Sequence, residues 1–330
     1  MPANIRILPS GHSVPSEGNS TLLEAGLHSG LALGYGCSNG NCGECLARIV
    51  SGEVRKVRHH DYLISEAQKT SGHVLMCCNT AVTDVVLEAP EARRSSEIPR
   101  QQITARVRNI EYVNDDVALL HLKTPRTRRL RFLAGQHVKL GGDKLPAAVH
   151  SISSCPCDDM NLHFQIPRLA NDGFSDHIFN HLKKGDHLDV EGPEGDFVLK
   201  ENSARSLVFI AWHTAFAPVR SLIEHAMALE VFDSLQLIWM TRSKKDRYQA
   251  NLCRSWQDAF DNFYYLPLDV DPGDGTIDTA STLRLLNIKP ADMNNYDFYV
   301  AGNETLINAF EKNPGWAFLT TPSALDNSGA

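Results

Sequence analysis

The chain has 330 residues, 42% of them hydrophobic and 22% charged, with 22 glycines and 16 prolines. This composition is that of a globular protein and excludes collagen, coiled coil and intrinsic disorder, while the length favours two or three domains. Thirty-two basic and 39 acidic side chains leave a net charge of −7, which opposes broad contact with a phosphate backbone, so no direct nucleic-acid binding is expected.

The sequence shows no pattern of membrane insertion or export. Its longest apolar run, Leu207–Trp212, is far shorter than the ~20 residues that span a bilayer. The first residues, MPANIRILPSG, lack the charged and then apolar pattern of a signal peptide. We therefore expect a cytoplasmic protein that makes no membrane contact and keeps its cysteines reduced.

Residues 1–94 predict a small domain of short strands around a loop. Thr21 and Glu24 form a capping-box pair that opens a helix with apolar residues at helical spacing. Further apolar runs predict strands, and the expected elements lie at residues 5–8, 21–27, 46–50 and 84–87. The charged, Pro- and Ser-rich stretch 88–100 has the composition of a linker, which places a domain boundary near Ser95.

Two further domains follow the linker. Between residues 100 and 203, short apolar stretches are broken at regular intervals by Gly, Pro or Asp, which is typical of an antiparallel barrel. Residues 204–330 contain longer apolar runs, and helical stretches separate the first of them. Alternating strands and helices predict an α/β domain with a mostly parallel sheet.

Cysteine spacing is the strongest chemical signal. Cys37, Cys42 and Cys45 have the C-x4-C-x2-C spacing of a plant-type [2Fe–2S] cluster. Gly40 and Gly43 lie inside this loop and let its backbone curl close to the metal. Structural zinc is the alternative, but zinc sites usually use paired short knuckles, and a single C-x2-C is present.

The fourth ligand must come from a later part of the chain, where Cys77 and Cys78 compete. If the two residues lie in a strand, alternation points their side chains to opposite sides. Only one of them can then bind the cluster.

Three motifs in the second domain become informative through their order behind the cysteine loop. They are Phe132–His137, His150–Ser153 and Gly192–Phe197. With this order the chain resembles the ferredoxin-linked flavoprotein reductases of bacterial multicomponent oxygenases over nearly its whole length. The resemblance implies a multidomain α+β and α/β fold with a plant-type ferredoxin (β-grasp) domain, an antiparallel FAD-binding β-barrel and a nucleotide-binding-like α/β domain, at residues 1–94, 100–203 and 204–330.

The resemblance also implies which cysteines bind the cluster. In the family the fourth ligand follows an apolar triplet, which here is residues 74–76. The expected ligands are therefore Cys37, Cys42, Cys45 and Cys77, and Cys78 is spare.

FAD is implied for the barrel, although one anchoring residue is missing. The family's Arg-x-Tyr-Ser, whose Arg pairs with the flavin phosphates and whose Tyr lies against the ring, is here Ala-Val-His-Ser at residues 148–151. An imidazole can still stack, and Arg168 is the substitute cation. We therefore expect FAD at less than full occupancy, held by His150, Ser151, Ile152, Ser153, Arg168, Gly173, Phe174, Ser175 and Thr214.

The nicotinamide site departs further from the family. The family's Gly-Gly-Gly-Thr-Gly-x-Ala-Pro loop brings bare backbone to the flavin and the dinucleotide, and it reads Ala-Trp-His-Thr-Ala-Phe-Ala-Pro at residues 211–218. Trp212 and His213 then occupy space that a nicotinamide needs. We expect that NAD(P)H is not bound. The alternative is that these side chains turn outward and NADH still binds in a rearranged loop.

The pattern of losses resembles a divergent branch of the family, the reductase-like iron–sulfur flavoproteins that co-regulate tetralin catabolism. We therefore expect a redox-sensing co-regulator of catabolic gene expression that has no catalytic residue and exchanges single electrons through [2Fe–2S] and FAD. Its expected partners are a ferredoxin and a transcription activator. The alternatives are a working NADH-dependent ferredoxin reductase of an aromatic-ring dioxygenase, and an interaction scaffold with an inert flavin domain.

Two weaker signals have ordinary interpretations. Residues 123–131 carry five basic side chains, which is typical of a solvated hairpin face, with a docking patch for an acidic ferredoxin as the sharper alternative. Cys155 and Cys157 are separated by one residue, a spacing that suits neither a cluster nor a zinc knuckle, and are expected to be plain barrel residues.

Overall fold

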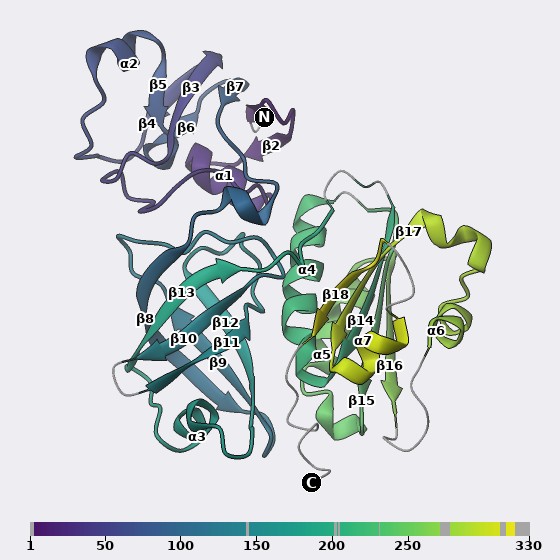
Figure 1. Cartoon of the computed structure of the whole chain (residues 1–330). Coiled ribbons are helices and arrows are strands. Elements are labelled where there is room, and N and C mark those ends of the chain that lie inside the picture. Colours follow the sequence, from purple (N-terminus) through teal and green to yellow (C-terminus); the bar gives the residue numbers. More distant parts are fainter. Residues whose placement is uncertain are drawn as a thin grey trace.

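The computed structural model describes residues 3–320 apart from 143–144, 201–202, 204, 231, 271–277 and 311–314. It contains three main sheets that follow one another along the chain (Figure 1). The fold class expected from the sequence is confirmed: a mixed α+β domain, an antiparallel barrel and a parallel α/β domain. No helix in the described part of the chain is long and apolar enough to cross a membrane.

The N-terminal domain is a five-stranded mixed sheet packed against helix α1 (Leu22–His28). The capping box is formed as expected, because Glu24 N–H donates to the Thr21 hydroxyl at 3.2 Å and Thr21 N–H donates to the Glu24 carboxylate at 2.9 Å. The other elements are β1 (Ala3–Leu8), β2 (Ser13–Ser16), β3 (Leu46–Ser51), β4 (Val54–Lys56), α2 (Glu66–Thr70), β5 (His73–Leu75), η1 (Met76–Cys78), β6 (Asn79–Ala81) and β7 (Val85–Glu88).

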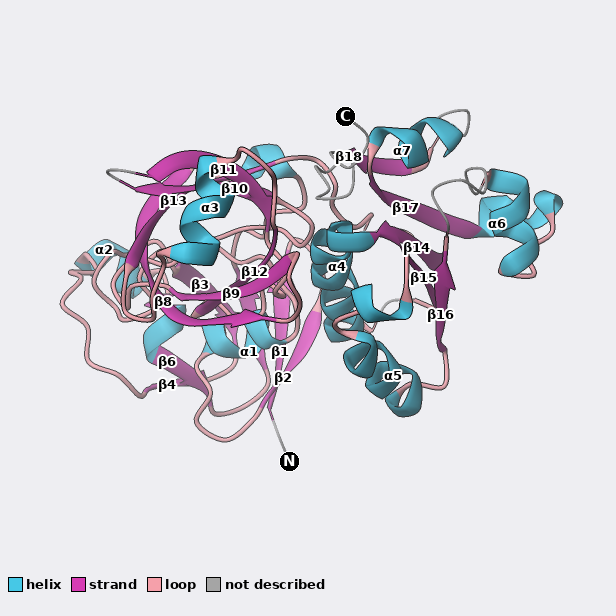
Figure 2. Cartoon of the chain, turned by 90° about the horizontal axis from the view of Figure 1, so that it is seen from below, coloured by secondary structure: helices cyan, strands magenta, loops and turns pink. Residues whose placement is uncertain are grey.

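The middle domain is a six-stranded antiparallel sheet with the order β11-β10-β13-β8-β9-β12, which curls into a barrel (Figure 2). Side chains at alternate positions of its strands fill one apolar interior. The linker contains η2 (Ser95–Glu97), and the barrel elements are β8 (Gln101–Tyr112), β9 (Val117–Lys123), β10 (His137–Gly142), β11 (Leu145–Ser151), β12 (Asn161–Pro167), α3 (Gly173–Asn180) and β13 (His187–Glu194).

The C-terminal domain is a five-stranded parallel sheet with the order β16-β15-β14-β17-β18. Helices α4 and α5 cover the face toward the barrel, while α6 and α7 cover the other face (Figure 1). Strand order reverses between β14 and β17, which makes the carboxyl ends of these strands the topological switch point. The elements are β14 (Ser206–Trp212), η3 (His213–Ala215), α4 (Phe216–Leu229), β15 (Leu235–Thr241), η4 (Lys244–Asp246), α5 (Ala250–Ala259), β16 (Phe263–Asp269), α6 (Thr279–Leu285), η5 (Pro290–Asn295), β17 (Tyr296–Gly302), α7 (Glu304–Phe310) and β18 (Ala317–Thr320).

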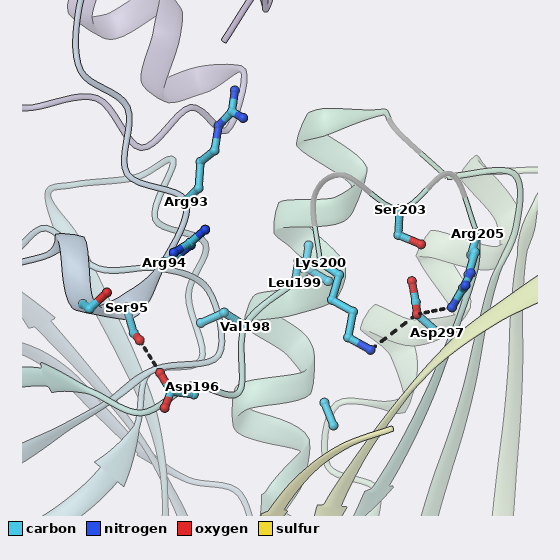
Figure 3. Close-up of a pocket in the computed structure, with 12 residues that line it drawn as sticks. Arg93, Arg94, Ser95, Asp196, Val198, Leu199, Lys200, Ser203, Arg205 and Asp297 are labelled. Carbon is cyan, nitrogen blue, oxygen red and sulfur yellow. Dashed lines mark hydrogen bonds and ion pairs between the residues drawn. The ribbon is translucent and has the colours of Figure 1, made fainter. Parts of the chain in front are cut away.

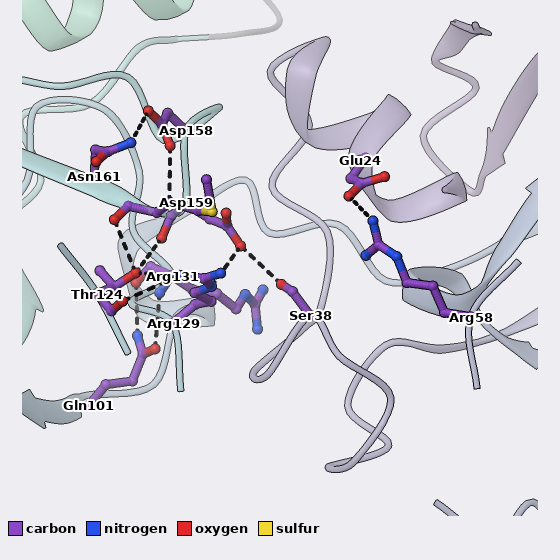
Figure 4. Close-up of polar contacts among 11 residues, drawn as sticks. Glu24, Ser38, Arg58, Gln101, Thr124, Arg129, Arg131, Asp158, Asp159 and Asn161 are labelled. Atoms are coloured by element: carbon purple, nitrogen blue, oxygen red, sulfur yellow. Dashed lines mark hydrogen bonds and ion pairs between the residues drawn. The ribbon is translucent and has the colours of Figure 1, made fainter. Parts of the chain in front are cut away.

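The basic run at residues 123–131 is solvated only in part, which corrects the sequence interpretation. Arg129 is buried, and its backbone N–H donates to the Gly36 carbonyl at 2.7 Å. Its guanidinium lies 3.5 Å from the Asp159 carboxylate (Figure 4). Ser38 of the cysteine loop donates its hydroxyl to the same carboxylate at 2.9 Å. A buried cation needs an anionic partner. Arg129 therefore fastens this chain's own N-terminal domain to the barrel.

Cys155 and Cys157 are not the plain reduced residues that the sequence predicts, because they form a disulfide in the loop between β11 and β12. Their Cα atoms are 5.2 Å apart, which is within disulfide reach. The same loop touches helix α4: Ser221 donates its hydroxyl to the Ser154 carbonyl at 2.7 Å, and Cys155 N–H donates to the Glu224 carboxylate at 3.2 Å. The disulfide thus lies in a barrel loop that contacts the C-terminal domain.

Candidate functional site

The four cysteines named from the sequence come together in two pairs. Cys45 Sγ and Cys77 Sγ lie 3.2 Å apart, and Cys37 Sγ is hydrogen-bonded both to the Cys42 side chain and to the Cys42 backbone N–H, which is 3.4 Å away. Among the described residues, no three Cys, His, Asp or Glu side chains gather where a single metal ion could be held. A [2Fe–2S] cluster takes four thiolates on two irons. The two-by-two grouping fits such a cluster.

The surroundings favour the thiolate, the form of cysteine that binds iron, at Cys37 and Cys45. Burial instead raises the pKa of Cys42, and the hydrogen bond with Cys45 raises that of Cys77. N–H groups of Asn41 and Cys42 both donate to Cys37 Sγ at 3.4 Å. Burial by itself raises the pKa of Cys37, but backbone N–H donors outweigh it, so this pKa lies below its ordinary value. The hydrogen bond with the Cys77 thiol lowers the pKa of Cys45 to about 7.

Glycines let neighbouring side chains close over the cysteine loop. Gly40 has φ +86°, and a Cβ there would lie 2.6 Å from His60 Cβ and 2.7 Å from Cys78 Sγ. Gly43 has φ +82°, and the Tyr62 ring occupies the place of its missing Cβ. Both positions require glycine, since they combine a left-handed backbone with a close approach.

Cys77 and Cys78 lie in the turn η1 rather than in the strand that the sequence interpretation assumed. Strand alternation therefore does not separate them, and both thiols are buried with their sulfurs 3.6 Å apart. Cys77 contacts Cys45, whereas Cys78 Sγ approaches the His59 carbonyl at 3.9 Å. This geometry favours Cys77 as the fourth ligand, and the assignment stays a prediction.

His150 lines a cavity of about 110 Å³ between the barrel and the C-terminal domain, together with Ser151 and Thr214. Its ring centroid lies 4.9 Å from that of Phe174, and its Nε2 is buried with no hydrogen-bond partner among the described residues. Burial lowers the pKa of His150 to about 4, so the imidazole is neutral at pH 7. A flat ring with polar edge atoms, such as a flavin, fits this set because the orphaned nitrogen would gain a partner.

Gln165 also lines this cavity and was missed by the sequence reasoning. The Tyr248 hydroxyl donates to Gln165 Oε1 at 2.6 Å, and Gln165 Nε2 donates to Gln249 Oε1 at 2.9 Å, so this side chain ties the barrel to the C-terminal domain. A buried polar residue in an apolar strand is the signal that could have marked it. The other lining residues are His137, Val149, Pro167, Ala217, Pro218 and Leu319.

The expected phosphate end of the flavin site suits its ligand less well. Ala148 stands where the family has its arginine, and the Arg168 guanidinium lies 4.4 Å from the centre of the Phe179 ring. At the start of α3, Ser175 N–H donates to the Asp172 carboxylate at 2.6 Å. That carboxylate occupies a helix N-terminus, which is where a phosphate would otherwise be favoured.

Other residues expected to bind FAD have structural roles in the barrel. Ile152 lies in the apolar interior, and Ser153 N–H donates to the His163 carbonyl at 2.8 Å. The Ser175 hydroxyl donates to the Pro167 carbonyl at 3.3 Å, and Gly173 is the first residue of α3. Flavin contact by these residues stays a prediction.

The loop after β14 lies at the switch point of the parallel sheet, where this fold binds its ligands. His213 has φ +47°, is 1% exposed, and accepts a hydrogen bond at its carbonyl from Trp239 Nε1–H at 3.0 Å. Trp212 lies against Gly302 of β17, where an added Cβ would be 3.0 Å from Trp212 Cβ. Two large side chains therefore lie where the resemblance predicts bare backbone, and an obstructed nicotinamide site stays a prediction.

When bound, a [2Fe–2S] cluster carries single electrons, and FAD links single-electron transfer to two-electron chemistry. The cysteine loop would hold the cluster, and His150 would lie against the flavin ring. Arg129 and Ser38 hold the cysteine loop on the barrel through Asp159. The chain can thus keep both redox sites in one fixed arrangement.

Comparisons with known proteins agree with this arrangement. Residues 5–83 match the 2Fe-2S iron-sulfur cluster binding domain family, and residues 104–199 match the oxidoreductase FAD-binding domain family. Among solved structures, the Amycolatopsis cytochrome P450 reductase GcoB has the same fold, with a TM-score of 0.59 at 23% identity over 96% of this chain and 98% of that chain.

Two curated relatives extend over most of the sequence. CDP-6-deoxy-L-threo-D-glycero-4-hexulose-3-dehydrase reductase of Yersinia pseudotuberculosis is 30% identical over 94% of this chain and 93% of its own length. Terephthalate 1,2-dioxygenase reductase component 2 of Comamonas sp. is 29% identical over 82% of this chain and 80% of its own length. The chain therefore belongs to the family of electron-transfer reductases that join a [2Fe–2S] ferredoxin-type domain to an FAD-binding oxidoreductase domain.

Proposed function

We propose that this protein exchanges single electrons between its [2Fe–2S] cluster, FAD and a protein partner without taking hydride from NAD(P)H. One observation at the carboxyl end of β14 carries the proposal. Trp212, the last residue of this strand, lies against Gly302, and His213 of the following loop is buried. The family has glycine at both loop positions, so nicotinamide would compete with two large side chains for this space. The paired cysteines and the His150 cavity, in contrast, keep the features that electron transfer needs.

The proposed partner is a ferredoxin that supplies the electrons, and the proposed role is redox sensing in the cytoplasm. A protein that only another electron carrier can reduce reports the redox state of that carrier. A transcription activator would receive this signal, as in the regulatory branch that the sequence resembles.

The second candidate function is an NADH-dependent reductase component of an aromatic-ring dioxygenase. The names of the curated relatives favour it, since the Comamonas relative is the reductase component of terephthalate 1,2-dioxygenase. In that case Trp212 and His213 would have to move out of the switch point when the dinucleotide binds.

Anaerobic mixing of the FAD-loaded protein with excess NADH separates the two functions. We expect flavin and cluster absorbance to stay unchanged with NADH and to bleach fully with dithionite or a reduced ferredoxin. The dithionite arm shows that both cofactors are present and reducible. Bleaching by NADH at rates in the ordinary enzyme range of about 1–10³ s⁻¹ would favour the reductase instead.

A further inference from the structure

A cleft of about 1000 Å³ lies where the linker, the end of the barrel and the C-terminal domain meet (Figure 3). Arg205 directly precedes β14 and Asp297 is the second residue of β17, so the cleft lies at the amino ends of these strands. The loop that begins at His213 follows the carboxyl end of β14. The cleft is therefore separate from both the nicotinamide-site loop and the flavin cavity, and its volume suits a small ligand.

The cleft carries a surplus of positive charge in a chain whose net charge is −7. Its charged lining consists of four cations and two carboxylates, namely Arg93, Arg94, Lys200, Arg205, Asp196 and Asp297. Arg93 and Arg94 are exposed, and their guanidinium groups make no ion pair or hydrogen bond with any described residue. Two free guanidinium groups on adjacent residues are suited to an anion with several oxygens, because the planar fork matches phosphate geometry.

Asp297 adds a second feature that points to a ligand. This carboxylate is 2% exposed, and its Oδ1 lies 3.5 Å from Lys200 Nζ and 3.4 Å from Arg205 Nη1 (Figure 3). Its Oδ2 is buried with no hydrogen-bond partner among the described residues. A buried carboxylate oxygen without a donor is unfavourable, and a ligand hydroxyl that donates to it would remove this cost.

We propose that this cleft binds a small sugar phosphate. The phosphate group would lie on Arg93 and Arg94, and a sugar hydroxyl would donate to Asp297 Oδ2. The described lining contains no aromatic side chain on which a nucleobase could stack, which favours a sugar phosphate over a nucleotide. Such a ligand would connect the linker to the C-terminal domain. The proposal does not depend on whether NADH reduces the flavin.

The first experiment titrates ribose 5-phosphate into the full-length, cofactor-loaded protein by isothermal calorimetry. We expect saturable binding at one site that weakens with salt and falls at least tenfold in the double variant R93A/R94A. The matched control is R126A/R128A, which removes the same charge from exposed residues outside the cleft and should bind like the parent. No saturable binding, or an equal loss in the control, would overturn the proposal.

The second experiment tests the hydroxyl contact. Inorganic phosphate should bind more weakly than ribose 5-phosphate, and the variant D297N, which also releases Lys200 and Arg205 from their ion pairs, should bring the two affinities together. Equal affinity of the unmodified protein for the two compounds would contradict the Asp297 contact. If D297N does not fold, the comparison of the two compounds on the unmodified protein still decides the point.

Discussion

The cysteine loop and the loop after β14 both contain residues with positive φ, but they differ in the side chains at those positions. In the cysteine loop, Gly40 and Gly43 have φ of +86° and +82°, and neighbouring side chains close over them. In the second loop, His213 has φ +47° where the family has glycine. The cysteine loop also has Ser38 at φ +53°, but glycine occupies the two positions where other side chains close in. Positive φ alone therefore does not define a binding site, because side-chain volume decides what can approach.

The second loop also carries a local energetic cost. An L-residue in the left-handed region is disfavoured by about 1–2 kcal/mol. His213 is held there by its burial and by the hydrogen bond from Trp239 to its carbonyl. The surrounding packing thus imposes a conformation that glycine would adopt without strain.

The largest expected effect comes from removing one cysteine ligand of the cluster. We expect C77S to lose the cluster, because one of the four thiolates is removed, and C78S to keep it. Iron content and the visible spectrum of the purified variants measure this. Because the two residues are adjacent and both buried, each variant is the control for the other. Cluster loss in C78S with retention in C77S would reverse the ligand assignment.

The second prediction restores glycine at four positions at the end of β14 and in the loop that follows it. The variant A211G/W212G/H213G/A215G should allow NADH to reduce the flavin at least about tenfold faster than in the parent, since four side chains leave the approach to the switch point. W212G alone should stay slow because His213 remains buried. Stopped-flow absorbance under anaerobic conditions measures both. Equal rates in the parent and the fourfold variant would show that another barrier controls the reaction.

A smaller effect is expected at the phosphate end of the flavin site in the barrel. A148R should tighten FAD binding about tenfold to a hundredfold, because one charge-assisted hydrogen bond contributes roughly 1.5–3 kcal/mol. Flavin fluorescence during titration of the flavin-free protein gives the affinity. A148M adds similar bulk without charge and should bind like the parent, so equal tightening in both variants would contradict the electrostatic explanation.

The smallest predicted change concerns pH and the His150 imidazole, whose Nε2 is buried. Burial holds the pKa of His150 at about 4 in the folded protein, below its ordinary value of 6.5. The unfolded chain therefore binds more protons between these values, and the free energy of unfolding falls as pH drops through this window. Replacing His150 should remove about 2 kcal/mol of the loss between pH 7 and pH 5.

Urea unfolding of H150F at both pH values tests this sign. His163 is partly buried and also has a pKa of about 4, so part of the pH dependence should remain in the variant. H59F replaces an exposed histidine and serves as the control. An unchanged pH dependence in H150F would mean that this imidazole does not have the depressed pKa.

Local patterns in the sequence determined much of the fold and the chemistry of its first domain. The spacing of Cys37, Cys42 and Cys45 reflects a loop that must present its ligands within a few residues, so it is readable without a structure. The Thr21–Glu24 capping box is local for the same reason. The expectation of an obstructed nicotinamide site also rests on the sequence, and it stays a prediction.

Contacts between distant segments could be decided only by the tertiary structure. The burial of Arg129 against Asp159, the position of Gln165 at a domain boundary and the approach of Cys77 to Cys45 each join residues far apart in the chain. Arg93 and Arg94 of the linker likewise line one cleft with Asp297 of the C-terminal domain. Composition and periodicity report which side chains a segment carries, whereas packing between domains decides which of them become buried, paired or left facing a cavity.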